Sequence, residues 1–112
     1  MSAQGDLELN LIELIGEVKT RHLCEQFGGT RLLIPANPHP DHRIASTIGM
    51  RATFILSENF APDVLNIPVA RGLRAKHYRN LGWSNARIAT ALGLTEGGVL
   101  RLLKKMNREA PE

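Results

Sequence analysis

The chain has 112 residues, of which 43% are hydrophobic, 22% are charged and 4% are aromatic, and its formal net charge is +3. This length suits one domain or two very small ones, and this composition is typical of a globular chain with an aliphatic core. One cysteine excludes an internal disulfide, and there is no run of about 18 apolar residues that could span a bilayer. The first ten residues do not resemble a secretion signal, so we expect a cytoplasmic protein.

Charge divides the chain into two parts. Residues 1–70 contain five Lys or Arg and eight Asp or Glu, a net charge of −3, whereas residues 71–112 contain nine basic and three acidic residues, a net charge of +6. Such asymmetry suggests that only the C-terminal part faces a polyanion. We therefore predict two regions, 1–69 and 70–112.

The first region repeats itself at an offset of 33 residues. Residues 11–35 and 44–68 align without a gap, and 9 of the 25 aligned positions are identical, where ordinary amino-acid usage gives about one or two by chance. In each copy, apolar residues at helical spacing precede a short apolar strand that a proline closes. Asp41 is expected to cap the second helix. Gly28–Gly29 and Ala61–Pro62 are expected to end the two helices.

Two copies are too few for a solenoid, which indicates a pseudo-twofold pair instead. Gly16 and Gly49 occupy the same position in the two copies. Glycine inside a helix costs about 1 kcal/mol relative to alanine, so we expect these two glycines to let the helices cross closely. The alternative is that both are tolerated surface glycines.

Two short strands do not make a stable sheet by themselves in water. We therefore predict a homodimer in which a second copy supplies further strands by edge pairing about a twofold axis. The expected interface residues are Arg31, Leu32, Leu33, Ile34, Val64, Leu65, Asn66 and Ile67.

The basic region predicts three helices. The first covers residues 70–81, with Leu73, His77 and Leu81 on one face and Gly82 at its end. The second covers residues 85–92 behind Ser84, and Thr95 caps the third. The expected core positions of the last two helices and their turn are Ile88, Ala89, Leu92, Leu94, Val99, Leu102 and Leu103, and Trp83 is expected to pack in this core.

The spacing of these residues predicts a helix-turn-helix, because a small residue, a turn glycine and a branched core residue fall at the required intervals. They are Ala89, Gly93 and Val99. An ordinary helical hairpin is the alternative, but the last helix is basic on the side opposite its apolar residues. The fold predicted for the whole chain is mainly α with short strands, a tandem helix–strand dimerisation region followed by a three-helix helix-turn-helix domain.

In this interpretation the last helix enters the major groove of double-stranded DNA. Arg101 is the expected bidentate ligand of guanine, and the start of the middle helix is expected to grip phosphate. The predicted DNA-binding residues are Ser84, Asn85, Arg87, Thr95, Glu96, Gly97, Leu100, Arg101, Lys104, Lys105 and Arg108. Gly97 and Gly98 are unusual there, since they either weaken the helix or permit close backbone approach.

The chain resembles the Mor transcription activator family of phage and prophage middle-operon regulators. The matching residues are "FGG" through "IP" at 27–35, the second "IP" at 67–68, and "GWSNARIATALGLTEGGVLRLLKK" at 82–105. The resemblance implies promoter binding as a homodimer, activation through bacterial RNA polymerase subunits, and a location on the nucleoid of a bacterial host. The chain differs from the founding activator in having two strand motifs where that protein has one.

Other functions have weaker support. His39, Asp41 and His42 are close together in a loop, but no matched third ligand is evident, so we expect no metal. There is no nucleophile motif and no glycine-rich phosphate loop, and the catalytic domain of a serine recombinase is absent. We therefore expect neither an enzyme nor a cofactor. The remaining alternative is a protein-interaction module that does not bind DNA specifically.

Overall fold

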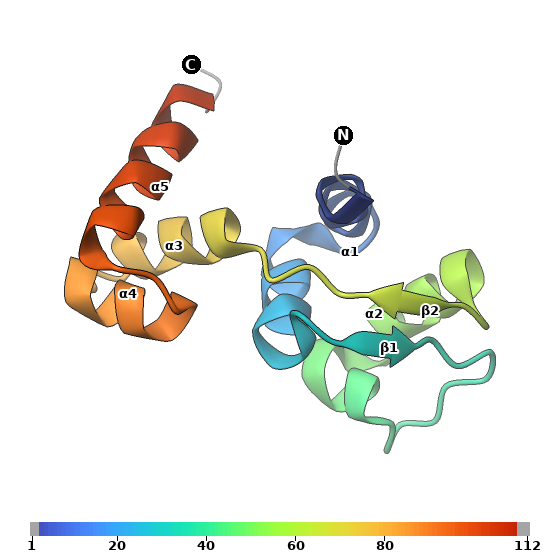
Figure 1. The fold of residues 1–112 in the computed structure, drawn as a ribbon. Coiled ribbons are helices and arrows are strands. Elements are labelled where there is room, and N and C mark those ends of the chain that lie inside the picture. Colours follow the sequence, from blue (N-terminus) through green and yellow to red (C-terminus); the bar gives the residue numbers. More distant parts are fainter. Residues whose placement is uncertain (1–2, 110–112) are drawn as a thin grey trace. The chain divides into compact units, whose positions relative to one another are not determined.

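The computed structural model describes residues 3–109, which are mainly helical with a two-stranded antiparallel sheet (Figure 1). This confirms the prediction of a mainly α fold with short strands. Along the chain the elements are α1 (Ala3–Phe27), β1 (Arg31–Leu33), α2 (Arg43–Phe60), β2 (Val64–Asn66), α3 (Arg71–Asn80), α4 (Asn85–Leu92) and α5 (Glu96–Glu109). Two compact units meet in sequence between Ala70 and Arg71, one residue after the boundary expected from the sequence. None of the helices within residues 3–109 is long and apolar enough to cross a bilayer.

The two long helices of the first unit are each interrupted at a glycine. Gly16 has φ 86° and ψ 164°, and Gly49 has φ 85° and ψ 161°. A Cβ added at Gly16 would meet nothing within 4 Å, and one at Gly49 would meet only Lys19 Nζ, at 3.9 Å. The expectation that these glycines let the helices cross closely is therefore wrong. They are needed because only glycine adopts this backbone conformation without strain.

The strands β1 and β2 pair with each other within one chain. The register places Arg31 opposite Asn66, Leu32 opposite Leu65, and Leu33 opposite Val64. Side chains alternate between the two faces of a strand, and on one face Leu32, Ile34 and Ile67 are fully buried. The other face is exposed, so the sheet covers the core of the first unit on one side only.

The connections at the ends of the helices depend on specific local residues. A Cβ added at Gly28 would collide with the carbonyl oxygen of Cys24 and lie 3.0 Å from the carbonyl oxygen of Pro68, so the chain is too close there for any other residue. Gly29 has φ 81°, as expected for a positive-φ helix end.

Asp41 does not cap α2. The cap is His42, whose Nδ1 accepts a hydrogen bond from the backbone N–H of Ile44 at 3.1 Å; Asp41 lies one residue too early and is exposed.

The three helices of the second unit enclose a small core. Its buried members are Ala75, Tyr78, Ile88, Ala89, Leu92 and Val99, against which Trp83, Leu94, Leu102 and Leu103 pack while partly exposed. The buried positions expected in α4 and α5 are thus in the core.

The face predicted for α3 is not the most buried one, because Leu73 and His77 are only half-buried. Ala75 and Tyr78 are buried, whereas Leu81 is 58% exposed and lies beyond the end of the helix. The expected stop at Gly82 is confirmed. Gly82, with φ 85°, donates its N–H to the Arg79 carbonyl at 2.9 Å, and Trp83 donates its N–H to the Tyr78 carbonyl at 3.0 Å. This pair of bonds is a Schellman motif.

Candidate nucleic-acid interface

The segment from α4 to α5 is fixed at both helix starts and at the turn between them. Ser84 Oγ accepts a hydrogen bond from the N–H of Arg87 at 3.1 Å, which caps α4. Gly93 ends α4 in the left-handed conformation, with φ 69° and ψ 35°. Leu94 then donates its N–H to the Ala89 carbonyl at 2.9 Å. Thr95 Oγ1 accepts from the N–H of Gly98 at 3.0 Å and caps α5.

One side of α5 is buried and the other side is basic. Val99 is fully buried, and Leu102 and Leu103 pack against the core. The predicted contact residues of this helix all lie on the exposed side. They are Glu96, Gly97, Leu100, Arg101, Lys104, Lys105 and Arg108. Leu100 is 50% exposed among these charges, so the exposed side is not purely polar.

The two glycines at the start of α5 have different surroundings. A Cβ added at Gly98 would lie 3.2 Å from Thr95 Oγ1 and 3.6 Å from Leu94 Cβ, so a side chain there would crowd the helix cap. At Gly97 the nearest atom would be Arg101 Nη1, at 3.7 Å, an ordinary contact. The Arg101 guanidinium therefore lies beside the first turn of α5, where the missing side chain of Gly97 leaves room.

The side chains at the start of α4 are less available to a ligand than the sequence suggested. Ser84 is exposed, but its oxygen is engaged in the cap. Asn85 is half-buried, and its Oδ1 is buried without a hydrogen-bond partner among the described residues. Arg87 is exposed, yet its guanidinium carbon lies 3.8 Å from the centroid of the Trp83 ring. Trp83 in turn stacks on Tyr78, with centroids 4.3 Å apart and planes 12° apart.

Two arginines of α3 have a structural use that sequence analysis missed. Arg71 Nε donates to the Leu92 carbonyl at 3.1 Å, and Arg74 Nη2 donates to the Ala91 carbonyl at 3.4 Å. Cations are favourable at the negative C-terminal end of a helix, here α4. The partners are 21 and 17 residues apart in sequence, so no local pattern could have indicated them.

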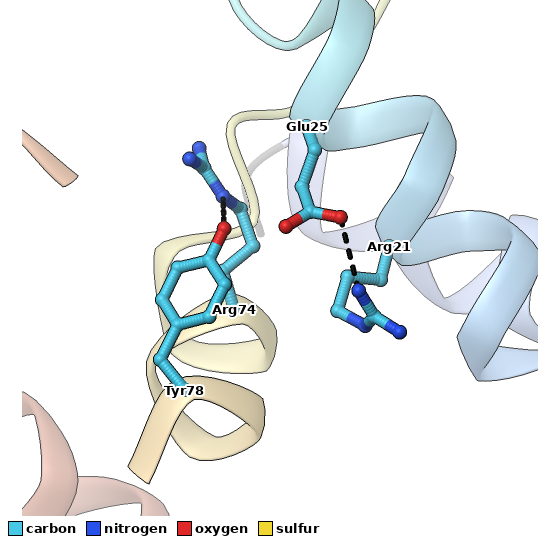
Figure 2. A network of polar contacts seen from close by, with 4 residues as sticks. All are labelled: Arg21, Glu25, Arg74 and Tyr78. Atoms are coloured by element: carbon cyan, nitrogen blue, oxygen red, sulfur yellow. Dashed lines mark hydrogen bonds and ion pairs between the residues drawn. The ribbon is translucent and has the colours of Figure 1, made fainter. Parts of the chain in front are cut away.

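Figure 2 shows two polar contacts, one in each unit. In the second unit, Arg74 Nε also donates to Tyr78 Oη at 3.3 Å. In the first unit, Arg21 Nη1 donates to Glu25 Oε1 at 3.0 Å across one turn of α1. Such an i,i+4 pair stabilises a helix by about 0.2–0.5 kcal/mol.

The residues predicted for a homodimer interface divide according to the face of the sheet. Leu32, Ile34 and Ile67 are fully buried inside one chain, so their side chains are not available to a partner. Leu65 is half-buried. The exposed members are Arg31, Leu33, Val64 and Asn66. The contacts within one chain do not test the homodimer itself.

The histidine-rich loop before α2 is held by local bonds. The backbone N–H of Asp41 donates to His39 Nδ1 at 3.1 Å. Among residues 3–109, no three His, Cys, Asp or Glu side chains gather as a metal site would require.

Comparisons of the chain with family models, with curated proteins and with solved structures found no match.

Proposed function

We propose that this chain is a sequence-specific double-stranded DNA-binding regulator of transcription, and that α4, the Gly93 turn and α5 form a helix-turn-helix. The observation that carries the proposal is the two-sided character of α5. Val99 anchors its inner side, whereas Arg101, Lys104, Lys105 and Arg108 leave its outer side. A rigid helix with one basic, exposed side suits the major groove, which admits a helix and is lined by phosphates.

The residues take different roles in this arrangement. The first turn of α5 enters the groove, so Arg101 is the side chain best placed to bond both O6 and N7 of guanine. Lys104, Lys105 and Arg108 lie further along the helix and neutralise phosphates. The start of α4 faces the backbone, where the unbonded N–H groups of its first turn attract a phosphate.

The position of Arg87 supports a backbone role rather than a base-reading one. Its guanidinium carbon lies over the Trp83 ring, which restricts the direction of the side chain, and Arg87 is an exposed residue. An arginine that is held in place loses less side-chain entropy when it binds a phosphate. We assign Arg87 to phosphate positioning.

The resemblance of residues 27–35, 67–68 and 82–105 to the Mor family extends the proposal to regulation. It favours activation of a bacterial or phage promoter through contact with RNA polymerase subunits. Repression would need the same contacts with DNA, so the assignment of the DNA-binding surface does not depend on this point.

Selection from a random DNA pool, followed by salt titration, tests the proposal. We expect enrichment of one short motif. We also expect affinity for that motif to fall steeply between 50 and 200 mM salt, by about 10³-fold or more if some six phosphates are contacted. A pool that stays random after repeated selection would refute sequence-specific binding.

A second candidate function is a protein-interaction module, which the 50% exposure of Leu100 on the basic side of α5 favours. Apolar contacts respond little to salt, whereas counterion release makes DNA binding strongly dependent on it. Leu100→Ala distinguishes the two functions. It would abolish binding to an apolar partner surface and leave the salt dependence of DNA binding unchanged.

A further inference from the structure

The pairing of β1 with β2 is symmetric with respect to the 33-residue repeat. Leu32 and Leu65, which are equivalent in the two copies, lie opposite each other. Arg31 faces Asn66 and Leu33 faces Val64, and an offset of 33 converts each of these pairs into the other. A local twofold axis therefore passes between Leu32 and Leu65.

Backbone hydrogen bonds around the sheet follow the same symmetry. Ile67 donates its N–H to the Thr30 carbonyl at 2.9 Å, and the equivalent bond runs from Ile34 to Asp63 at 3.0 Å. The backbone N–H of Thr30 donates to the Phe27 carbonyl at 3.0 Å, and the N–H of Asp63 donates to the Phe60 carbonyl at 2.8 Å. The N–H of Gly29 bonds to Ile67 at 2.8 Å without an equivalent, because Pro62 occupies that position and has no N–H.

The helices obey this relation as well. Gly16 and Gly49 have nearly the same backbone angles. Four equivalent pairs are fully buried in both copies, namely Leu11 and Ile44, Thr20 and Thr53, Leu23 and Leu56, and Ile34 and Ile67, whereas Leu32 is fully buried and its equivalent Leu65 half-buried.

We infer that α1–β1 and α2–β2 form an internal pseudo-dimer, in which each copy supplies the partner that a second chain would otherwise supply. A twofold contact between identical chains pairs residue i with j and residue j with i, and the register of β1 and β2 has this form within one chain. The need for further strands, on which the predicted homodimer was based, lapses because one face of this two-stranded sheet is buried against the core of the first unit.

The outer edges of the sheet are poor templates for a further strand. Each strand has only three residues. Pro35 and Pro68 follow closely and offer no N–H groups, and Arg31 places a charge on the β1 edge. Short strands, prolines and charges are the features by which native sheets avoid edge pairing. Leu33 and Val64, 57% and 46% exposed on the outer face, form a single apolar pair there, much smaller than a stable interface.

One consequence, which rests on the proposed function, concerns the DNA site. A scaffold closed within one chain carries a single α5, whereas a dimer joined through its strands would carry two. The chain is then expected to recognise one half-site as a single molecule and to need no palindrome.

The mass of the chain in solution tests the inference without DNA. Sedimentation at micromolar concentration should give the mass of one chain, and a mass of two chains would overturn the inference. A double variant, Leu33→Cys with Val64→Cys, tests the pairing directly, because these residues face each other across the strands. After oxidation it should migrate on a non-reducing gel as one cross-linked chain. Covalent dimers that neither single variant forms would show that the strands pair between chains.

A DNA experiment tests the consequence. Duplexes with one copy and with two symmetric copies of the selected motif should bind the chain with equal affinity per copy and without cooperativity. An affinity gain of tenfold or more for the paired motif would overturn the inference that the chain binds as a single molecule. Failure to select any motif would refute the proposed function and leave the result on mass unaffected.

Discussion

Arg87 and Tyr78 lie on opposite faces of the Trp83 ring. The Arg87 guanidinium carbon is 3.8 Å from the Trp83 centroid and the Tyr78 ring is 4.3 Å from it, and two groups this close do not share one face. The stack joins the end of α3 to the start of α4, so the orientation of a cation on the proposed DNA-binding surface depends on the core of the second unit.

Arg87→Ala is expected to loosen this stack. Trp83 is the only tryptophan, so its emission reports on the contact and should shift to longer wavelength as water reaches the uncovered ring. We expect a loss of about 0.5–1 kcal/mol in the free energy of unfolding, the usual range for an exposed cation–π pair. Arg87→Lys keeps the charge and should recover part of the stability. Unchanged emission in the alanine variant would contradict the arrangement.

Arg101→Ala is expected to relax specificity at one base pair of the selected motif and to weaken binding by about 1–3 kcal/mol. The measurement is affinity for the motif and for its variants at that position. Arg51→Ala, at an exposed position of the first unit, removes the same charge and should leave affinity nearly unchanged. An equal loss of affinity for all DNA sequences would refute the base-reading role of Arg101.

Gly16→Ala and Gly49→Ala are each expected to destabilise the first unit by about 1–3 kcal/mol, although alanine is the better helix former. The reason is the backbone angle, since an added Cβ has room at both positions. Gly97→Ala is the matched comparison. Gly97 lies in α5 without a positive φ, and the change should stabilise by up to about 1 kcal/mol. Chemical unfolding of the three variants checks the signs. Stabilisation by Gly16→Ala would mean that α1 is not interrupted there.

Thr20→Val and Thr53→Val should have different effects on the free energy of unfolding. Thr53 Oγ1 donates to the Gly49 carbonyl at 2.7 Å, whereas Thr20 Oγ1 is buried and has no hydrogen-bond partner among the described residues. Valine preserves the shape of threonine and removes the hydroxyl. We expect Thr53→Val to cost about 0.5–1.5 kcal/mol, and Thr20→Val to be neutral or to stabilise by about 1 kcal/mol. Equal losses in thermal unfolding would contradict this difference.

Glu8→Gln is expected to raise stability at neutral pH. Burial raises the pKa of the Glu8 carboxyl above its usual value of 4.5, so the folded chain binds this proton more tightly than the unfolded chain does. The associated stability is fully present below pH 4.5 and is lost as the pH rises through the folded pKa. The gain in Tm should therefore be largest near pH 7 and vanish at low pH. Glu13→Gln, an exposed change on the same helix, controls for net charge. A gain that does not depend on pH would contradict the desolvation of Glu8.

Much of the structure of the second unit could be predicted from local sequence. Glycine, serine and threonine act at helix ends through their own backbone or side-chain atoms, so Ser84, Gly93 and Thr95 could be assigned without a fold. Apolar spacing identified Ile88, Leu92 and Val99. The same rules failed for α3, because its buried face depends on which side the other two helices cover.

The repeat was also visible in the sequence, but its geometric meaning was not. Glycine at both Gly16 and Gly49 indicated equivalent positions in the two copies. The close helix crossing inferred from these glycines was wrong. Identity cannot distinguish a glycine chosen for its lack of a side chain from one chosen for its backbone angles. Asp41 failed as a cap for a related reason, since the choice between Asp41 and His42 depends on where the loop turns into α2.

By itself, the sequence determined the division into an acidic repeat and a basic helical region, the helix ends and most core positions of α4 and α5, because these depend on neighbouring residues and on composition. Only the tertiary structure decided that β1 pairs with β2 inside one chain, that Arg71 and Arg74 bind the end of α4, and that Arg87 rests on Trp83. Those contacts join residues whose distance in space the order of the chain does not specify, and they form only when packing brings separate elements together.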